Sequence, residues 1–283
     1  MEKSLLIGDF LLGLKFIYGA PVLPFSYLKF PAVGDVKPGD VVIFEYPGND
    51  NRDYIKRAVA GPGQTIEISE ETLVIDGRER VLPPNGMYVQ KGRLRLREVA
   101  DFAPLRIPAK GDTLKPSELP VREFLFAKNL INQENPRNRV IKFLESFFLT
   151  KGIVRQDLNN ERVKIQLQMY LDGDFTSSRQ INEINKAPIF TTIDDWISLK
   201  MRMAEINNWA QKAFPGKHVA LQKMLTLDGK PLTRYIVKHD NYFMLGDNRD
   251  NSMDSRYWGY LNRNYVKAKA FILYFSWNGY RWC

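Results

Sequence analysis

The sequence has a single cysteine, Cys283, and only two histidines, His218 and His239. One cysteine cannot form a disulfide framework or supply a cysteine metal cluster. Neither histidine lies in a recognisable catalytic pattern. We therefore expect a protein that works without a metal and without a cofactor.

Long hydrophobic runs are also missing. No apolar stretch approaches the roughly 18 to 20 residues that cross a bilayer as a helix. The first residues lack the basic-then-apolar pattern of a secretory signal. Taken by itself, the sequence is expected to behave as a soluble piece that carries no anchor.

Acidic residues are the scarcer kind of charge, since 41 Lys and Arg face 32 Asp and Glu and the formal net charge is +9. No block of consecutive basic residues stands out, and the densest stretch, residues 91–97, alternates like a strand with one charged face. A solvated face and an anionic membrane surface both suit this pattern. Because no zinc spacing or recognition-helix pattern is present, we expect lipids of a membrane surface and no nucleic acid among the partners.

Short strand-like runs occupy the first quarter and the last fifth of the chain. They are rich in Val, Ile, Phe and Tyr, and Asp-Gly turns follow two of the runs, at Asp76 and Asp228. The runs cover residues 40–44, 65–68, 73–75, 224–227, 235–237, 242–245 and 270–275. This pattern predicts a β-sheet domain divided between the two ends of the chain.

The middle of the chain is mixed. Residues 163–171 alternate between apolar and polar, which predicts a half-buried strand, and a short helix is expected over 140–148. Apolar residues then recur every three or four positions from Trp196 to Ala210, which predicts an amphipathic helix that faces the core. The expected fold is mainly β, with a split catalytic domain at 1–75 and 235–283 and a large inserted α+β domain at 76–234.

Residues 246–259 read GDNRDNSMDSRYWG and combine turn formers, charges of both signs and two aromatic residues. Gly, Asp and Asn accept tight backbone conformations and hydrogen-bond to their own neighbours. We expect a loop held by polar contacts, rather than a helix or strand. Ordinary packing does not require such a composition, so the segment is a candidate site.

A lysine stands in the second notable segment, residues 53–59, which read DYIKRAV. Most lysines with apolar neighbours are surface charges whose stems lie along apolar surface. Together with residues 246–259, however, this segment resembles the diagnostic motifs of the bacterial type I signal peptidases, which are membrane-bound serine proteases with a lysine base. The resemblance implies that Lys56 is the general base and that Ser252 orients its amine.

The chemistry of such a base sets a requirement on Lys56. An ammonium cannot accept a proton, so the side chain must be buried enough for its pKa to fall toward neutrality. A Ser-Lys pair then needs neither histidine nor a third acidic residue. The resemblance assigns a structural role to the charges nearby, with Arg57 paired to Asp247 and Arg256 paired to Asp254.

The nucleophile of that family precedes a Leu-Leu-Ile-Gly-Asp run, which here is residues 5–9. Counting back puts the methionine of the motif at Met1 and the serine one residue before it. Ser4 is the nearest hydroxyl but takes the place of a threonine of the motif. A truncated sequence, a late start codon and a protein without its nucleophile would each explain this, and the chain as numbered is expected to be inactive.

The resemblance also implies a substrate and a location. Signal peptides end in small residues spaced as Ala-x-Ala, so shallow apolar pockets are expected beside the dyad. The candidate substrate-binding residues are Met1, Leu5, Leu11, Asp53, Tyr54 and Ile55. The expected function is removal of signal peptides from exported preproteins on the outer face of the bacterial cytoplasmic membrane.

Two other interpretations remain open at this stage. A scaffold of peptidase fold could hold extended peptides without cutting them. A self-cleaving Ser-Lys peptidase of the repressor type would share the chemistry, but that family lacks the long loop at 246–259 and no DNA-binding module precedes the site. Cleavage of a signal-peptide substrate discriminates among the three.

Overall fold

The computed structural model describes most of the chain, in segments. These are residues 10–19, 31–47, 52–69, 71–83, 86, 101–136, 162–172, 174–175, 196–275 and 281–282. Several expectations lie outside the described residues: Met1, Ser4, the run at 5–9, the basic stretch at 91–97 and the helix at 140–148.

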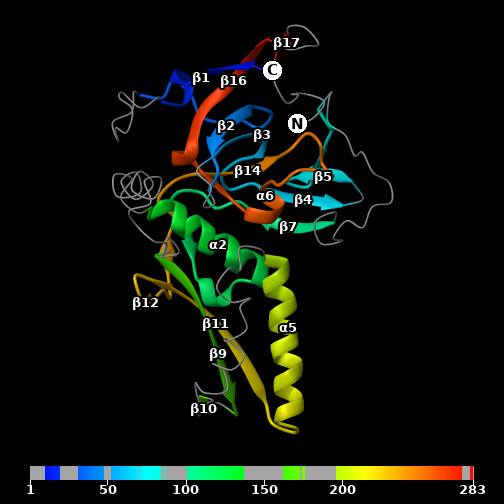
Figure 1. Ribbon diagram of the computed structural model, residues 1–283, viewed down its shortest axis with the longest axis vertical. Helices are drawn as coiled ribbons and strands as arrows, with labels where there is room; N and C mark the ends of the chain where they lie inside the picture. Colours follow the sequence, from blue (N-terminus) through cyan, green and yellow to red (C-terminus); the bar gives the residue numbers. More distant parts are fainter. Residues whose placement is uncertain are drawn as a thin grey trace, which may run out of the picture.

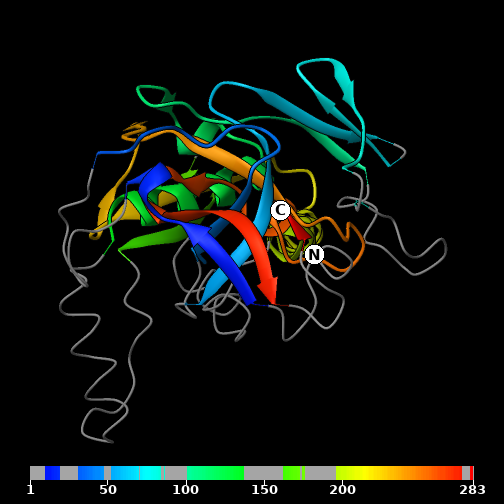
Figure 2. The same cartoon turned by 90° about the horizontal axis from the view of Figure 1, so that it is seen from above.

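A seven-stranded antiparallel sheet forms the upper part of the molecule (Figure 1). Its order is β1-β16-β2-β3-β14-β15, and β17 pairs with β16. The strands are β1 (Phe10–Leu14), β2 (Val41–Glu45), β3 (Asp53–Ala60), β14 (Asn241–Leu245), β15 (Leu261–Asn262), β16 (Val266–Phe275) and β17 (Arg281–Trp282). Strands from the two ends of the chain thus share one sheet, and seen from above β1 and β16 run side by side (Figure 2).

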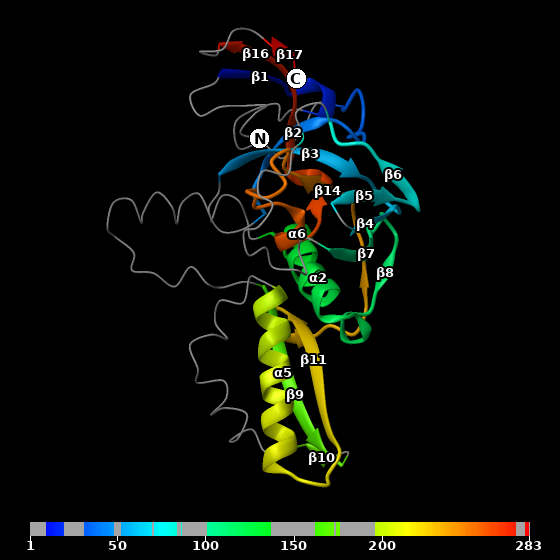
Figure 3. The same cartoon turned by 90° about the vertical axis from the view of Figure 1, so that its right-hand side faces the viewer.

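Two smaller sheets and a strand pair are the other β structure among the described residues. The second sheet has the order β6-β5-β4-β7, the third β10-β9-β11-β12, and β8 pairs with β13. Their strands are β4 (Thr65–Ser69), β5 (Thr72–Ile75), β6 (Arg78–Arg80), β7 (Phe102–Arg106), β8 (Thr113–Leu114), β9 (Val163–Leu171), β10 (Asp174–Phe175), β11 (Val219–Leu227), β12 (Lys230–Pro231) and β13 (Tyr235–Ile236). In Figure 3, β9 and β11 extend away from the main sheet with one helix along them.

The two expected hairpins are present where the Asp-Gly pairs stand. Asp76 and Gly77 have φ of 51° and 72°, and Asp228 and Gly229 have φ of 51° and 79°. Two consecutive positive φ values define the turn that best fits the twist of a two-residue hairpin. These pairs join β5 to β6 and β11 to β12.

Three α-helices lie among the described residues: α2 (Val121–Glu134), α5 (Trp196–Ala213) and α6 (Ser255–Trp258), with short 3-10 turns η1 (Phe16–Tyr18), η2 (Pro116–Glu118) and η4 (Arg263–Tyr265). The predicted amphipathic helix is confirmed as α5, and its face with Trp196 and Leu199 packs in the core. Helix α2 was not predicted. Ten of its 14 residues are buried, around most of its circumference, so it lacks the one-sided apolar stripe of a surface helix.

The seven-stranded sheet separates two apolar clusters. In β14, Tyr242 and Met244 point to one cluster, and Phe243 and Leu245 to the other, because successive strand side chains face opposite ways. The smaller cluster also contains Val42, Phe44, Ala58 and Trp258. The larger one continues through the second sheet and α2 to Trp196 and Leu199 of α5.

The prediction of a mainly β fold is confirmed. The expectation of a loop without helix at 246–259 was wrong at one place, since residues 255–258 form α6. Asp254 caps this helix through its side chain and Gly259, with φ of 88°, ends it. Among the described residues, no helix has the length and apolar character that a membrane span requires. The domain boundaries at 75/76 and 234/235 stay a prediction.

Candidate functional site

Strand β3 presents Lys56 on the face of the smaller apolar cluster. Lys56 pairs with Val42 of β2, and it lies two residues from Ala58, whose side chain belongs to that cluster. Along the edge of β3 that is opposite to β2, the pairing of Leu245 of β14 with Arg57 brings Gly246 beside Lys56. The Nζ atom of Lys56 donates a hydrogen bond of 2.8 Å to Oγ of Ser252.

Burial lowers the pKa of the Lys56 amine from its ordinary value of 10.5. The nearby charges act in both directions, because the Asp254 and Asp247 carboxylates raise this pKa and the Arg256 guanidinium lowers it. Desolvation is the largest of these effects. The amine is therefore shifted toward its neutral form by the apolar face that holds it.

Gly246 is required by the contact between Lys56 and Ser252. A Cβ atom at this position would lie 2.1 Å from Oγ of Ser252 and 2.6 Å from its Cβ. It would also lie 3.5 Å from Nζ of Lys56. No side chain fits there unless the serine moves, so the glycine at the start of the loop allows the serine to reach the lysine.

The expected ion pair of Arg57 with Asp247 is present. Nε and Nη2 of Arg57 donate to the two carboxylate oxygens of Asp247, both at 2.9 Å, and Nη1 donates to the carbonyl of Gly39. Such a bidentate pair fixes direction as well as distance. It ties the beginning of the loop to the strand that carries Lys56.

The second expected pair, Arg256 with Asp254, is also present and is more deeply buried. Nε and Nη2 of Arg256 donate to Asp254 at 2.8 and 2.9 Å. Burial alone would raise the pKa of Asp254, but the Arg256 guanidinium and the hydrogen bonds outweigh it and the pKa is lowered. Asp254 also accepts from the backbone N–H of Gly246 at 3.1 Å, so this carboxylate closes the loop on itself.

Helix α2 holds the chain that leaves the loop. Nδ2 of Asn129 donates to the carbonyl of Trp258 at 3.1 Å. The buried amide of Gln133 donates to the carbonyl of Tyr260 at 2.8 Å and accepts from the N–H of Asn262 at 2.9 Å. Because no motif of the sequence marks these residues, sequence reasoning missed them; the only signal was an unusual number of amides in an apolar segment.

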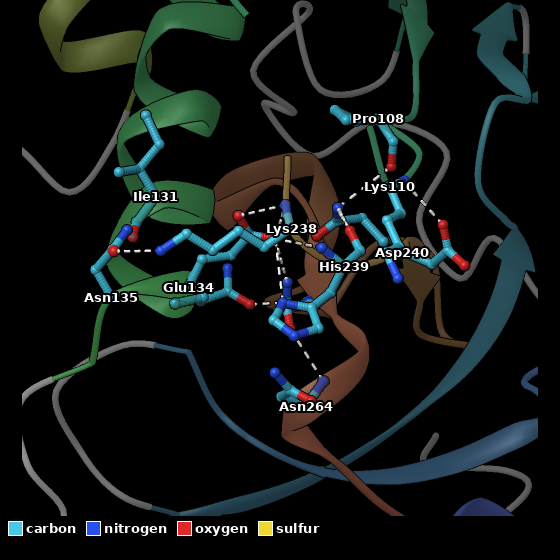
Figure 4. Close-up of polar contacts among 12 residues, drawn as sticks. Pro108, Lys110, Ile131, Glu134, Asn135, Lys238, His239, Asp240 and Asn264 are labelled. Carbon is cyan, nitrogen blue, oxygen red and sulfur yellow. Dashed lines mark hydrogen bonds and ion pairs between the residues drawn. The ribbon is translucent and has the colours of Figure 1, made fainter. Parts of the chain in front are cut away.

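A second polar cluster lies at the end of α2 around Glu134, whose side chain is fully buried (Figure 4). Its carboxylate accepts from Tyr235 Oη at 2.8 Å, from the N–H groups of Lys238 and His239, and from Nδ2 of Asn262. Nδ1 of His239 lies 3.6 Å from the same carboxylate. This cluster joins α2 to the segment before β14 and to β15, and sequence reasoning did not find it.

Four of the predicted substrate-binding residues are described. Leu11 pairs with Leu273 across β1 and β16, and Ile55 pairs with Ile43 across β2 and β3. The ring of Tyr54 stacks on Tyr46 with centroids 4.6 Å apart. The exposed Asp53 accepts from Nζ of Lys267 at 2.6 Å. Their role in binding stays a prediction, as do the roles of Met1 and Leu5.

The arrangement provides a partly desolvated amine that, among the described residues, donates a hydrogen bond to the hydroxyl of Ser252. Since Ser252 accepts, the lone pair of a neutral Lys56 stays available to take a proton from another group. No group of three or more His, Cys, Asp or Glu side chains that could hold a metal exists within the described part of the chain. The chemistry that the site offers is acid-base chemistry centred on one lysine.

Comparison with known proteins shows the family of the chain. A family model described as "Signal peptidase, peptidase S26" matches residues 1–112 and 158–277. The chain belongs to this family. The match includes β4 to β7, β9, α5 and β11, which lie outside the motifs at 5–9, 53–59 and 246–259.

Individual relatives carry the name signal peptidase I. The chain is 26% identical over 279 residues to that of Buchnera aphidicola subsp. Baizongia pistaciae, covering 96% of this chain and 66% of the relative. It is 23% identical over 278 residues to that of Aquifex aeolicus, covering 98% and 72%. A relative from Pseudomonas fluorescens is 44% identical over 78 residues, 27% of each chain. The chain thus spans about two thirds of the length of the Buchnera relative.

A solved structure is similar at low level. The signal peptidase I of Enterococcus faecalis V583 is 14% identical, with a TM-score of 0.26 and coverage of 83% of this chain and 96% of that chain.

Proposed function

We propose that this protein is a serine endopeptidase that removes N-terminal signal peptides from exported preproteins, at sites with small residues spaced as small-x-small. Lys56 is the general base and Ser252 orients its amine. The observation that supports this role is the 2.8 Å contact of a half-buried, pKa-lowered Lys56 with Ser252. Membership in the signal peptidase family supports the choice of substrate.

The mechanism uses one lysine twice. Neutral Lys56 takes the proton of the nucleophilic serine, whose oxygen attacks the carbonyl of the last signal-peptide residue. The resulting ammonium gives its proton to the leaving amine of the mature protein, and an acyl-enzyme remains. Lys56 then takes a proton from a water molecule whose oxygen attacks the ester, and it returns this proton to the serine oxygen as the C–O bond breaks and the signal peptide leaves.

The serine itself is proposed to stand directly before Met1, as the family motif at 5–9 implies. The backbone N–H of this serine is the expected oxyanion donor beside the nucleophile. One lost oxyanion donor by itself costs roughly 100- to 1,000-fold in rate. Pairing of an extended peptide with sheet edges near Leu11 and Asp53 would hold the substrate.

The proposed place of action is the outer face of the bacterial cytoplasmic membrane, where exported preproteins emerge. Preproteins and the lipids of that surface are the proposed partners. The net charge of +9 favours contact with anionic lipid headgroups. No cofactor takes part in the proposed reaction.

The test compares cleavage of a preprotein by the chain extended with serine before Met1 and by the same protein with alanine there. Lys56→Ala in the serine form is expected to lower turnover by about 100- to 10,000-fold, the usual contribution of a general base. Lys164→Ala, at an exposed position of β9, is the matched control and should cleave normally. Turnover that persists in Lys56→Ala overturns the dyad, and a folded, inactive serine form that binds the peptide indicates the scaffold instead.

A further inference from the structure

Helix α5 contacts the segment at 246–259 through its first residue, Trp196. Trp196 is 5% exposed, and its indole Nε1 donates a hydrogen bond of 2.9 Å to the carbonyl of Arg256, in α6. This bond is buried and joins residues 60 positions apart. Figure 1 shows the top of α5 near α6, beneath the seven-stranded sheet.

Arg256 connects that bond to the lysine. Its guanidinium holds Asp254, whose carboxylate accepts from the N–H of Gly246. Nη2 of Arg256 also donates to the carbonyl of Arg249, and Nε of Arg249 donates to the carbonyl of Gly246. Two hydrogen-bonded paths therefore lead from Arg256 to Gly246, the residue that lies against both Ser252 and Lys56.

Arg256 and Asp254 also act on Lys56 through their charges. The Arg256 guanidinium lowers the pKa of Lys56 and the Asp254 carboxylate raises it, while burial remains the largest cause of the lowered value. A displacement of α6 would therefore change both the position of the loop and the solvent access of the amine. The hydrogen bond from Trp196 of α5 to the carbonyl of Arg256 opposes that displacement.

We propose that Trp196 is a positioning residue for the peptidase reaction, acting through Arg256 on the contact of Lys56 with Ser252. A tryptophan suits this task because its large ring fixes it in the core with Ile197 and Leu199, while its N–H reaches a polar partner. The inference rests on the proposed function and extends it, because it makes the α5 segment part of the catalytic support.

The test uses Trp196→Phe in the serine-extended protein, which keeps an aromatic ring and removes the N–H. We expect kcat to fall by about tenfold, equivalent to about 1.36 kcal/mol, with KM changed by less than about twofold. The acid limb of the pH profile should move to higher pH, because a looser loop admits water and raises the pKa of Lys56 toward its ordinary value. Trp209→Phe is the matched control on the same helix, at a residue that is 42% exposed, and should change neither quantity.

A second variant separates the lost hydrogen bond from lost volume. Replacing Trp196 by benzothienylalanine keeps the bicyclic shape and substitutes sulfur for the N–H. The same fall in kcat and the same pH shift are expected in this variant. If it behaves as the parent while Trp196→Phe is impaired, packing alone explains the effect and the positioning role is overturned.

A measurement without turnover distinguishes failure of this inference from failure of the proposed function. The carbon-13 resonance of Lys56 Cε, assigned by its loss in Lys56→Ala, reports the titration of the amine directly. It should titrate at higher pH in both Trp196 variants than in the parent. An unchanged titration overturns the positioning role even if the protein cleaves preproteins, and a shifted titration in a protein that cleaves nothing would sink the proposed function alone.

Discussion

At the scale of single residues, the site keeps a lysine close to two carboxylates without pairing it to either. Asp254 is engaged by Arg256, and Asp247 is engaged by Arg57. Each carboxylate therefore has its own cation, and its attraction for the Lys56 ammonium is largely offset by that neighbour. The hydroxyl of Ser252 satisfies the amine without adding a negative charge, which lets desolvation determine the direction of the pKa shift.

The substitution Lys56→Met is expected to increase the free energy of unfolding, by an amount that depends on pH. The pKa of Lys56 is lowered on folding, so between the folded and unfolded values the unfolded chain binds more protons and stability rises with pH. At pH values below the pKa of Lys56 in the folded protein, the cost of burying its charged amine is fully present. The free energy of unfolding of Lys56→Met should therefore exceed that of the parent at neutral pH, and the difference should shrink as pH rises toward 10.5.

Urea denaturation of both proteins at a series of pH values measures this difference, with Lys164→Met as the control for an added apolar side chain on an exposed strand position. A gain that is the same at every pH would show that packing, and not the charge of Lys56, is responsible. A loss of stability at neutral pH would contradict the proposed burial cost.

At the scale of elements, side chains of helix α2 form hydrogen bonds to the segments on both sides of the loop at 246–259. Gln133 reproduces with its side-chain amide the two hydrogen bonds that a neighbouring strand would make to Tyr260 and Asn262. The carboxylate of Glu134 accepts hydrogen bonds from the N–H groups of Lys238 and His239, just before β14. The segment that enters β14 and the segment that leaves the loop at 246–259 are thus held by consecutive residues of one helix.

Glu134→Gln is expected to lower the free energy of unfolding by about 2 to 3 kcal/mol. The amide keeps the shape but points an N–H₂ group at buried donors that the carboxylate accepts from, and hydrogen bonds to charged groups contribute about 1.5 to 3 kcal/mol. Denaturant unfolding measures the change. Glu118→Gln is the control, because its pair with Lys115 is exposed and should contribute under about 1 kcal/mol. Equal effects of the two substitutions would contradict the role given to Glu134.

How far the sequence predicts these elements depends on where each one buries its side chains. Strand β9 has exposed side chains at 164 and 166 between more buried ones at 163, 165 and 167, and its observed bounds are those expected. Helix α2 is buried nearly all round, so periodicity could not mark it. The segments around Lys56 and Ser252 stand out in the sequence because they concentrate turn-forming and charged residues. The contacts of Gln133, Glu134 and Trp196 depend on the tertiary structure, so no sequence pattern marks them.

At the scale of the whole molecule, one core cluster crosses the predicted domain boundaries. It contains Ile66 of β4 and Phe243 of β14, continues through Phe124 and Leu130 of α2, and reaches Leu199 of α5. The same cluster includes Val163 and Leu225, where β9 and β11 meet the helices. An inserted segment that shares its core with the split sheet is not expected to unfold separately from it.

Leu199→Ala tests this continuity. Leu199 is fully buried, and its truncation should cost about 2 to 5 kcal/mol. If the core is one cooperative unit, the denaturation midpoint reported by amide exchange in β14 should fall together with that reported in β9. Met201→Ala, at a side chain 61% exposed on the same helix, is the control and should leave both midpoints unchanged. A midpoint that falls in β9 alone would show that residues 76–234 form an independent domain, and the support of the Lys56 loop by α5 would then be lost at a lower denaturant concentration than the sheet itself.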